Sequence, residues 1–256
     1  MVRILLSGAY GRMGAAIAGY AALWEGCEVV AGIDPGEGSC SFPVFAEPCA
    51  PVPKADVIVD FSHPSALEPL LAYALSNKLP VVMATTGLAA GQIAAVQKAA
   101  EEIPVFLSAN MSLGINLLRE LIKESVRVLG PLFDIEIVER HHNLKLDAPS
   151  GTALMLADSA AAAMGGRPLY RYDRHPLREK RSGNEIGLHS VRGGSIAGDH
   201  DVIFAGPNEV ITLSHHAQTR EVFAAGALRA ALFLSDQAPG LYDMSDLIAS
   251  GLTDQK

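Results

Sequence analysis

The segment Val2–Gly14, VRILLSGAYGRMG, joins a short apolar run to three glycines spaced three residues apart. Residues 2–7 have the length and composition of a buried parallel strand, and residues 12–23 carry apolar side chains at helical spacing. Glycines between a strand and a helix allow a tight turn, in which backbone N–H groups approach a pyrophosphate at the helix N-terminus. The GxxGxxG pattern alone is a weak signal, but its place in a first strand–turn–helix unit predicts dinucleotide binding.

A second strand over 27–33 ends at Asp34, where a carboxylate can hydrogen-bond the hydroxyls of the adenine ribose. The next two residues are proline and glycine, so no cation adjacent to Asp34 would meet a 2′-phosphate. We therefore expect NADH to be preferred over NADPH. Arg12 could lie over the adenine or the phosphate, which keeps NADPH open, and an ordinary glycine turn with a loop aspartate is the alternative interpretation.

Strands and helices continue to alternate through the first half of the chain. Strands are expected at 55–61, 80–84 and 104–107, and helices at 64–76 and 89–102. This alternation predicts an α/β domain with a parallel sheet. Polar turns follow the fourth and fifth strands, at the sheet edge where open α/β sheets bind ligands. They are candidates for contacts with the nicotinamide and its ribose, although ordinary polar turns would look the same.

The second half of the chain has an α+β pattern. Helices are expected at 114–128, 150–164 and 219–234, and residues 165–184 are interpreted as a long loop. Strands are expected at 133–139, 186–191, 201–204 and 209–214, and the last three look antiparallel. The predicted sheet is open, and either mixed or antiparallel.

Composition excludes several classes of protein. Hydrophobic residues make up 49% and charged residues 19% of the chain, which excludes overall disorder. The net charge of −8 argues against binding nucleic acid or anionic lipid through bulk electrostatics. No apolar run approaches the roughly 20 residues that span a bilayer, and three cysteines are too few for a disulfide framework. We expect a soluble, cytoplasmic protein.

The densest chemical cluster is Glu139–Thr152, ERHHNLKLDAPSGT. Adjacent histidines without a third ligand at a suitable spacing make a poor zinc site, so no metal is expected. The PSGT turn provides ordinary capping residues, but free N–H groups at a helix start also hold carboxylates. Lys145 adds a cation, and His141 or His142 can exchange protons. The segment predicts an anion-binding pocket with proton-transfer groups. Arg192 is a less specific candidate, and His200 and His215–His216 are interpreted as structural.

Several motifs together resemble the dihydrodipicolinate reductase family, also called 4-hydroxy-tetrahydrodipicolinate reductase. They are GAYGRMG at 8–14, ATTG at 84–87, SANMSLGIN at 108–116, ERHHNLKLDAPSGTAL at 139–154, HSVRGGSIAGDHDVIFAG at 189–206 and the helix after Thr219–Arg220. The resemblance covers almost the whole chain. Its HHxxKxDAPSGT pattern is highly specific, whereas the glycine turn is not.

The resemblance implies a Rossmann-type dinucleotide-binding domain over 1–112 and 220–256, and a mixed-sheet domain over 113–219 that binds substrate and packs in a homotetramer. It also implies NAD(P)H-dependent reduction of a cyclic dicarboxylate imine, after loss of water from the 4-hydroxy compound, in lysine and diaminopimelate biosynthesis. Another two-domain dehydrogenase of an anionic substrate, of the aspartate dehydrogenase type, and a non-catalytic dinucleotide sensor are the competing hypotheses. A missing Lys145 or His141 would favour the sensor, and both residues are present.

The resemblance also assigns roles to individual residues. His141 would donate or accept a proton and Lys145 would donate one. Met111, Ala84 and His63 depart from residues common in the family, and His63 could alter NADPH binding. The residues implied for the cofactor are Gly8, Ala9, Tyr10, Gly11, Arg12, Met13, Asp34, Ala84, Thr85, Thr86, Ser108, Ala109, Asn110 and Met111. Those implied for the substrate carboxylates are His142, Lys145, Ser150, Gly151 and Thr152.

Overall fold

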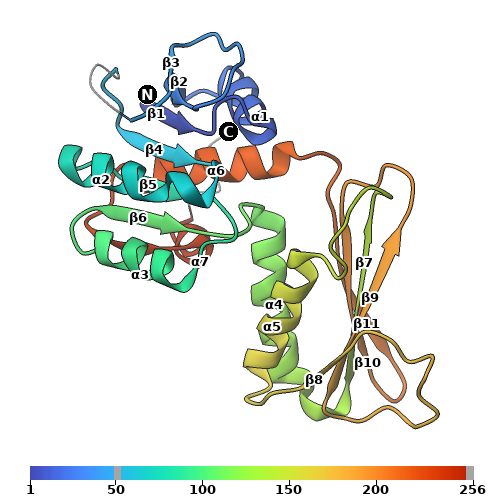
Figure 1. Ribbon diagram of the computed structural model, residues 1–256. Helices are drawn as coiled ribbons and strands as arrows, with labels where there is room; N and C mark the ends of the chain where they lie inside the picture. Colours follow the sequence, from blue (N-terminus) through green and yellow to red (C-terminus); the bar gives the residue numbers. More distant parts are fainter. Residues whose placement is uncertain (49–52, 252–256) are drawn as a thin grey trace. The chain divides into compact units, whose positions relative to one another are not determined.

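The computed structural model describes residues 1–48 and 53–251, which form two units (Figure 1). One unit consists of Met1–Leu113 and Arg220–Lys256, as far as these are described, and the other is Gly114–Thr219. Residues 252–256, at the end of the predicted cofactor domain, lie outside the described part. No helix within the described residues is long and apolar enough to cross a membrane.

The first unit is built on a seven-stranded sheet whose neighbouring strands are all parallel. The strand order is β12-β6-β5-β4-β1-β2-β3. Strands β2 and β3 are therefore added on one side of β1, and β4, β5 and β6 on the other, so the order reverses between β1 and β4. Ligands of open α/β sheets bind outside the carboxyl ends of the strands at such a switch point. The bounds are β1 (Val2–Ser7), β2 (Cys27–Ile33), β3 (Val44–Phe45), β4 (Val57–Asp60), β5 (Val81–Met83), β6 (Pro104–Leu107) and β12 (Gly240–Tyr242).

Helices cover both faces of this sheet, because its strands are apolar on both sides (Figure 1). Helices α1 (Arg12–Ala21), α6 (Glu221–Leu234) and α7 (Met244–Ala249) share one apolar cluster with the sheet. Helices α2 (Leu67–Asn77) and α3 (Ala90–Ala99) share the other, and a 3-10 turn over Pro64–Ala66 leads into α2. The alanine-rich helix α6 therefore brings the end of the chain back into the core of this unit.

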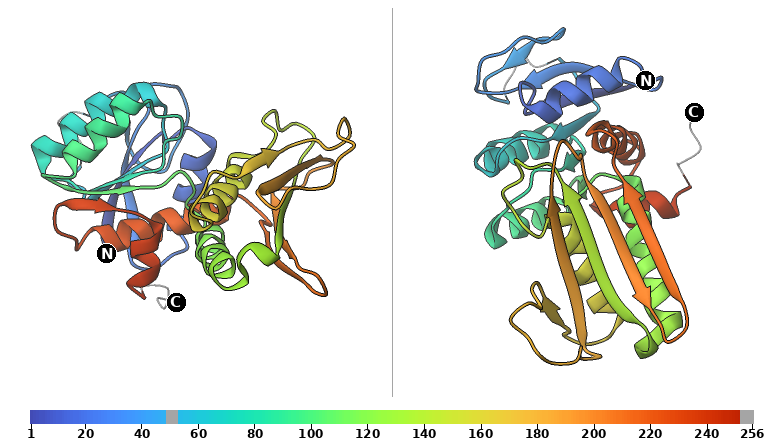
Figure 2. Two further views of the ribbon diagram at one scale, coloured as in Figure 1. Left: turned by 90° about the horizontal axis from the view of Figure 1, so that it is seen from below. Right: turned by 90° about the vertical axis from the view of Figure 1, so that its right-hand side faces the viewer.

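The second unit is a five-stranded mixed sheet of order β11-β10-β7-β9-β8, with two helices on one face (Figure 2). Along β7, Ile135 and Ile137 are buried against these helices, while Glu136 and Val138 alternate onto the other face. No helix of the described part of this unit lies over that second face, which we call the open face (Figure 2). The bounds are α4 (Leu113–Leu129), a 3-10 turn (Gly130–Leu132), β7 (Asp134–His141), α5 (Gly151–Ala163), β8 (Leu169–Arg171), β9 (Glu185–Arg192), β10 (Asp199–Ala205) and β11 (Val210–His216).

Two sequence predictions for this sheet are wrong. Strand β9 pairs in parallel with both β7 and β8, whereas the prediction grouped it with antiparallel strands. The chain returns from β7 to β9 through α5, and such a helical crossover produces parallel pairing. The predicted loop 165–184 contains strand β8, a three-residue edge strand whose arginines and short length hide it from pattern analysis. The short elements β3, β12 and α7 were not predicted either.

Candidate active site

The glycine turn between β1 and α1 is a close-packed corner. Gly8 has a φ of 82°, and a Cβ on it would lie 2.7 Å from the Phe61 carbonyl oxygen. A Cβ on Gly14 would lie 2.3 Å from the Gly8 carbonyl oxygen. Gly11 precedes α1 without a side-chain cap. The N-terminus of α1 therefore has no side-chain cap on its backbone N–H groups, which is the arrangement that suits a pyrophosphate.

Asp34 is held directly beside this turn. Its Oδ2 accepts a hydrogen bond from the Tyr10 backbone N–H at 3.0 Å, and its Oδ1 accepts one from the Gly36 N–H at 2.9 Å. The carboxylate is thus oriented by the backbone on both sides, without a charged partner among these contacts. The structure brings together the two parts of the predicted adenosine site, the glycine turn and the acidic residue after β2.

A buried carboxylate that the sequence reasoning missed lies at the end of β4. Asp60 is only 1% exposed. Its Oδ2 accepts a hydrogen bond from Thr85 Oγ1 at 2.6 Å, and its Oδ1 accepts one from Ser62 Oγ at 2.6 Å. Asp60 therefore positions the predicted turn after β5. The sequence feature that could have revealed Asp60 is its position directly after three apolar residues, where a further apolar residue is expected at the end of a buried strand.

The turn after β6 is also ordered by its own side chains. Ser108 Oγ donates to the Asn110 carbonyl oxygen at 2.9 Å, and Asn110 Oδ1 accepts from the Ser112 N–H at 2.9 Å. The Met111 side chain packs in the core beside α6 and is 2% exposed. Of the remaining predicted cofactor residues, Ala9 and Ala84 are buried, Tyr10 and Met13 are half-buried, and Arg12, Thr86 and Ala109 are exposed. All of these segments follow β1, β2, β5 or β6, so they share one edge of the parallel sheet.

The predicted substrate residues gather at the N-terminus of α5 in the second unit. Ser150 is the N-cap, and its Oγ accepts a hydrogen bond from the Ala153 N–H at 3.1 Å. The same hydroxyl lies 3.0 Å from His200 Nε2. His200 is 4% exposed, and burial together with the nearby His141 ring lowers its pKa to about 4. It is therefore neutral at pH 7. Gly151 is exposed and Thr152 is half-buried in the first turn.

Glu139 ties this helix start to His141. It is fully buried, and its Oε2 accepts from His141 Nδ1 at 2.6 Å while its Oε1 accepts from the Ser150 N–H at 3.1 Å. Arg192 binds both oxygens, with two N–O distances of 2.7 Å. Burial alone would raise the pKa of Glu139, but hydrogen bonds from Arg192, His141, Ser190 and the Ser150 N–H outweigh it and hold the pKa at about 2. The carboxylate is therefore ionised at neutral pH.

Lys145 and His142 lie on the loop between β7 and α5. Lys145 Nζ is 2.9 Å from Asp147 Oδ1, and the lysine side chain is 22% exposed. Burial would raise the pKa of Asp147, but the hydrogen bond from Lys145 outweighs it, so this pKa is lowered. The Nδ1 atom of His142 is buried and has no hydrogen-bond partner among the described residues. An ammonium group and an unsatisfied ring nitrogen thus accompany the helix N-terminus.

This cluster can hold a carboxylate and move protons. Glu139, Arg192 and His200 complete it. Sequence reasoning gave Glu139 no site role, interpreted His200 as structural and named Arg192 only as a less specific candidate. The available signal was the position of Glu139, which occupies an inward-facing place on β7 where an apolar residue would be expected. Within the described residues, no group of three or more His, Cys, Asp or Glu side chains could hold a metal ion.

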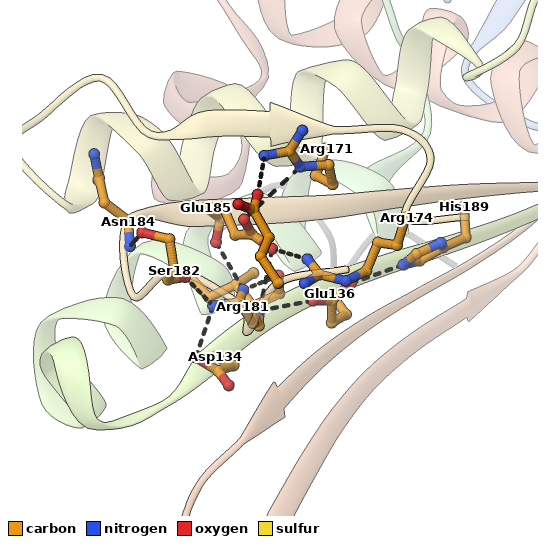
Figure 3. Close-up of polar contacts among 11 residues, drawn as sticks. Asp134, Glu136, Arg171, Arg174, Arg181, Ser182, Asn184, Glu185 and His189 are labelled. Carbon is orange, nitrogen blue, oxygen red and sulfur yellow. Dashed lines mark hydrogen bonds and ion pairs between the residues drawn. The ribbon is translucent and has the colours of Figure 1, made fainter. Parts of the chain in front are cut away.

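A second polar network holds the segment after β8 against the mixed sheet (Figure 3). Arg181 donates from Nε to Glu136 at 2.9 Å and from Nη1 to Asp134 at 2.7 Å, which fastens the segment to β7. Glu136 also lies 2.7 Å from His189 Nε2. Glu185, which is 3% exposed, forms ion pairs with neighbouring arginines (Figure 3). Its carboxylates are paired with arginines, and its residues are distinct from the cluster around Glu139.

Comparison with known proteins gives a consistent result. Residues 2–111 match the family model for the N-terminus of dihydrodipicolinate reductase, and residues 114–248 match the model for its C-terminus. The chain is 52% identical over 251 residues to the 4-hydroxy-tetrahydrodipicolinate reductase of Caldanaerobacter subterraneus subsp. tengcongensis, covering 98% of this chain and 100% of that protein. It is 45% identical over 251 residues to the enzyme of that name from Clostridium novyi, with 98% and 99% coverage.

A solved structure is similar along almost its whole length. It is the dipicolinate-bound dihydrodipicolinate reductase from Paenisporosarcina sp. TG-14, which is 26% identical to this chain and superimposes with a TM-score of 0.77. The similarity covers 95% of this chain and 97% of that one. The α/β domain with a parallel sheet and the mixed-sheet domain expected from the sequence are both confirmed.

Proposed function

The chain belongs to the dihydrodipicolinate reductase family, and on that premise we propose which of its residues carry the family's reaction. The reaction is the NAD(P)H-dependent reduction of 4-hydroxy-tetrahydrodipicolinate in lysine and diaminopimelate biosynthesis. The glycine turn, Asp34 and the turns after β5 and β6 hold the cofactor. The α5 N-terminus with His141, His142 and Lys145 holds the substrate. The observation that carries this proposal is the buried network in which Glu139 joins His141 to the N-terminus of α5.

The cofactor assignment is supported by the shape and charge of the first unit. The glycine turn precedes a helix N-terminus that has no side-chain cap and so suits a pyrophosphate, and the Asp34 carboxylate stands beside this turn. We propose that Asp34 accepts hydrogen bonds from the ribose hydroxyls and that NADH is therefore preferred. A 2′-phosphate would bring negative charge to a carboxylate whose contacts are backbone N–H groups of Tyr10 and Gly36 rather than a cation.

The substrate assignment is supported by the donors at the α5 N-terminus. Backbone N–H groups at a helix start carry partial positive charge, and Lys145 adds a full one. A dicarboxylate can therefore be bound by Ser150, Gly151, Thr152, His142 and Lys145. Binding at fixed donors also orients the ring of the substrate, which contributes to catalysis by positioning.

The chain's own chemical contribution is proton transfer. When bound, the nicotinamide supplies the hydride. His141 acts as proton donor or acceptor at the substrate, and Lys145 acts as a proton donor. Both functions suit the loss of water from the 4-hydroxy compound and the protonation of the reduced ring. General acid–base groups contribute roughly 10²- to 10⁴-fold to such reactions.

We further propose that the open face of the mixed sheet is the surface through which a homotetramer assembles. Val191 and Val210 stand on this face with 44% and 63% of their surface exposed. Apolar residues on an uncovered sheet are suited to packing against a second sheet. Light scattering on the purified protein tests this proposal: a tetramer supports it, and a monomer at micromolar concentration contradicts it.

A coupled assay tests the activity and the cofactor preference together. Pyruvate and aspartate semialdehyde, with the synthase that precedes this step, generate the unstable substrate, and oxidation of NADH and of NADPH is followed separately by absorbance. We expect synthase-dependent oxidation that is faster with NADH. Equal or faster oxidation of NADPH would contradict the proposed preference. Oxidation of neither cofactor by folded protein that binds NADH would favour another anionic substrate or a dinucleotide sensor.

A further inference from the structure

Glu139 is an unusual residue for its place in the fold. It lies on the face of β7 that packs against the helices, in line with Ile135 and Ile137, and it is fully buried. A buried carboxylate is costly unless it is paired and hydrogen-bonded. Both oxygens of Glu139 are engaged twice, by Arg192, by His141 and by the Ser150 N–H. Several hydrogen-bond donors therefore stabilise this one buried charge.

The ionised carboxylate determines which nitrogen of His141 carries hydrogen. A carboxylate only accepts hydrogen bonds, so His141 Nδ1 must be the donor across the 2.6 Å contact. Because the bidentate Arg192 and the other hydrogen bonds keep the pKa of Glu139 at about 2, the carboxylate does not take the proton at neutral pH. Proton exchange by His141 is left to Nε2.

The surroundings of Nε2 are consistent with an exchanging atom. A Cβ on Gly198 would lie 3.0 Å from Nε2, so the absence of a side chain at Gly198 keeps this atom uncrowded. The groups that face the His141 ring are Glu139 on β7, Arg192 on β9 and His200 on β10, whose ring lies edge-on with centroids 5.2 Å apart. His200 is neutral at pH 7, and the charge of Arg192 is paired with Glu139.

We propose that Glu139 is a positioning residue of the reductase reaction: it holds His141 in the Nδ1–H form, so that Nε2 is the atom that gives and takes the proton at the substrate. The same carboxylate anchors the Ser150 N–H and thereby keeps the imidazole in register with the N-terminus of α5. This inference rests on the proposed role of His141. It names Nε2 as the atom of His141 that exchanges the proton, and Glu139 as a residue that acts through His141.

Glu139→Gln is the informative substitution, because it changes hydrogen-bond chemistry with little change in size. In either orientation the introduced amide nitrogen faces one nitrogen of Arg192, and beside it either His141 Nδ1 or the Ser150 N–H. The backbone N–H cannot accept a hydrogen bond, whereas an imidazole nitrogen can. The introduced side chain should therefore donate to Nδ1 and move the ring hydrogen to Nε2.

The tautomer can be read without any turnover. Long-range proton–nitrogen NMR spectra of protein labelled with ¹⁵N-histidine, assigned with His141→Gln, distinguish the two neutral forms. We expect the neutral ring to be Nδ1–H in the unaltered protein and Nε2–H in Glu139→Gln. An Nε2–H ring in the unaltered protein overturns the proposal. This readout is independent of the substrate, so it separates a failure of this inference from a failure of the proposed function.

Kinetics then test whether the tautomer matters. Glu139→Gln should lower kcat by about 10²- to 10⁴-fold, change the pH dependence of kcat, and leave the KM for NADH within about threefold. In a His141→Gln background the same substitution should cause little further loss, because a residue that acts through His141 has nothing left to position. A kcat near that of the unaltered protein, or losses that multiply in the double variant, would overturn the positioning role.

The same strand provides a matched control. Glu136 also pairs with an arginine and a histidine, Arg181 and His189 (Figure 3), but it lies on the open face of β7. Glu136→Gln should leave the His141 tautomer and kcat unchanged, with the oligomeric state checked alongside. If Glu139→Gln does not fold, the double variant Glu139→Gln/Arg192→Met removes the arginine donor that faces the introduced amide. The His141 tautomer and kcat are then measured in that double variant.

Discussion

Replacing Arg192 by methionine should destabilise the protein strongly. The substitution keeps an unbranched apolar side chain but removes two hydrogen bonds and the countercharge from Glu139, which is fully buried. Breaking one partner of a buried ion pair costs about 3–5 kcal/mol, because the other charge stays buried without compensation. The Glu139 pKa of about 2, against an ordinary 4.5, indicates a similar scale of about 3 kcal/mol for the net stabilisation of the charged form.

The pH dependence of this contribution has a definite sign. Because the folded-state pKa of Glu139 lies below the unfolded value, its stabilisation is present above pH 4.5 and is lost as the pH falls towards 2. Without Arg192, one of the hydrogen-bond contributions that oppose burial is removed, so the pKa of Glu139 should rise. The loss of stability in Arg192→Met should therefore be largest at neutral pH and should shrink in acid.

Urea unfolding followed by circular dichroism at pH 7 and pH 4 measures these differences. Arg127→Met is the matched control, because Arg127 also pairs with a glutamate, Glu124, but both side chains are largely exposed on α4. Its unfolding midpoint should not move, since exposed ion pairs contribute little. Adding Glu139→Gln to Arg192→Met should recover stability. An Arg192→Met midpoint equal to that of the unaltered protein would show that Arg192 does not stabilise the buried Glu139 carboxylate.

Three further predictions concern other parts of the chain. Asp34→Ala should weaken NADH binding, measured by fluorescence titration, without lowering kcat at saturating NADH; unchanged affinity would remove its ribose role. His200 has a folded-state pKa of about 4, against an ordinary 6.5. The stability that its neutral form contributes is therefore present above pH 6.5 and is lost as the pH falls towards 4, by about 3 kcal/mol at most. His200→Gln should make the urea unfolding midpoint depend less on pH over that range. Gly226→Ala would place a Cβ 1.7 Å from the Met111 carbonyl oxygen and should cost about 1–3 kcal/mol. Gly19→Ala, which meets no atom within 4 Å in α1, should stabilise slightly; equal melting temperatures for the two alanine variants would contradict the packing argument.

Sequence periodicity predicted most of the architecture because the elements bury distinct faces. The apolar runs ending at Ser7 and Asp60 and the helical spacing after Gly11 each imply one element and one burial pattern. The direction of β9 could not be predicted in this way, since parallel and antiparallel strands alternate identically. It follows instead from the path of the chain through α5.

Only part of the candidate site could be predicted from the sequence. The glycine turn, Asp34 and the HHxxK–PSGT segment carry residue types that indicate their chemistry directly. Glu139, Asp60 and Arg192 act through contacts between segments that are distant in sequence, 53 residues apart for Glu139 and Arg192. No local pattern reports such a contact. A carboxylate at an inward-facing strand position was the one available clue.

Turnover and cofactor binding in His141→Ala and Lys145→Ala together test the proposed proton-transfer roles of these two residues. The coupled assay gives kcat, and fluorescence titration gives the Kd for NADH. Each variant should lose about two to four orders of magnitude in kcat, while its Kd for NADH should stay within about twofold. Near-normal turnover in either variant would remove that residue from the proton-transfer role, and a loss of NADH affinity that matches the loss of turnover would contradict the assignment of these residues to the substrate.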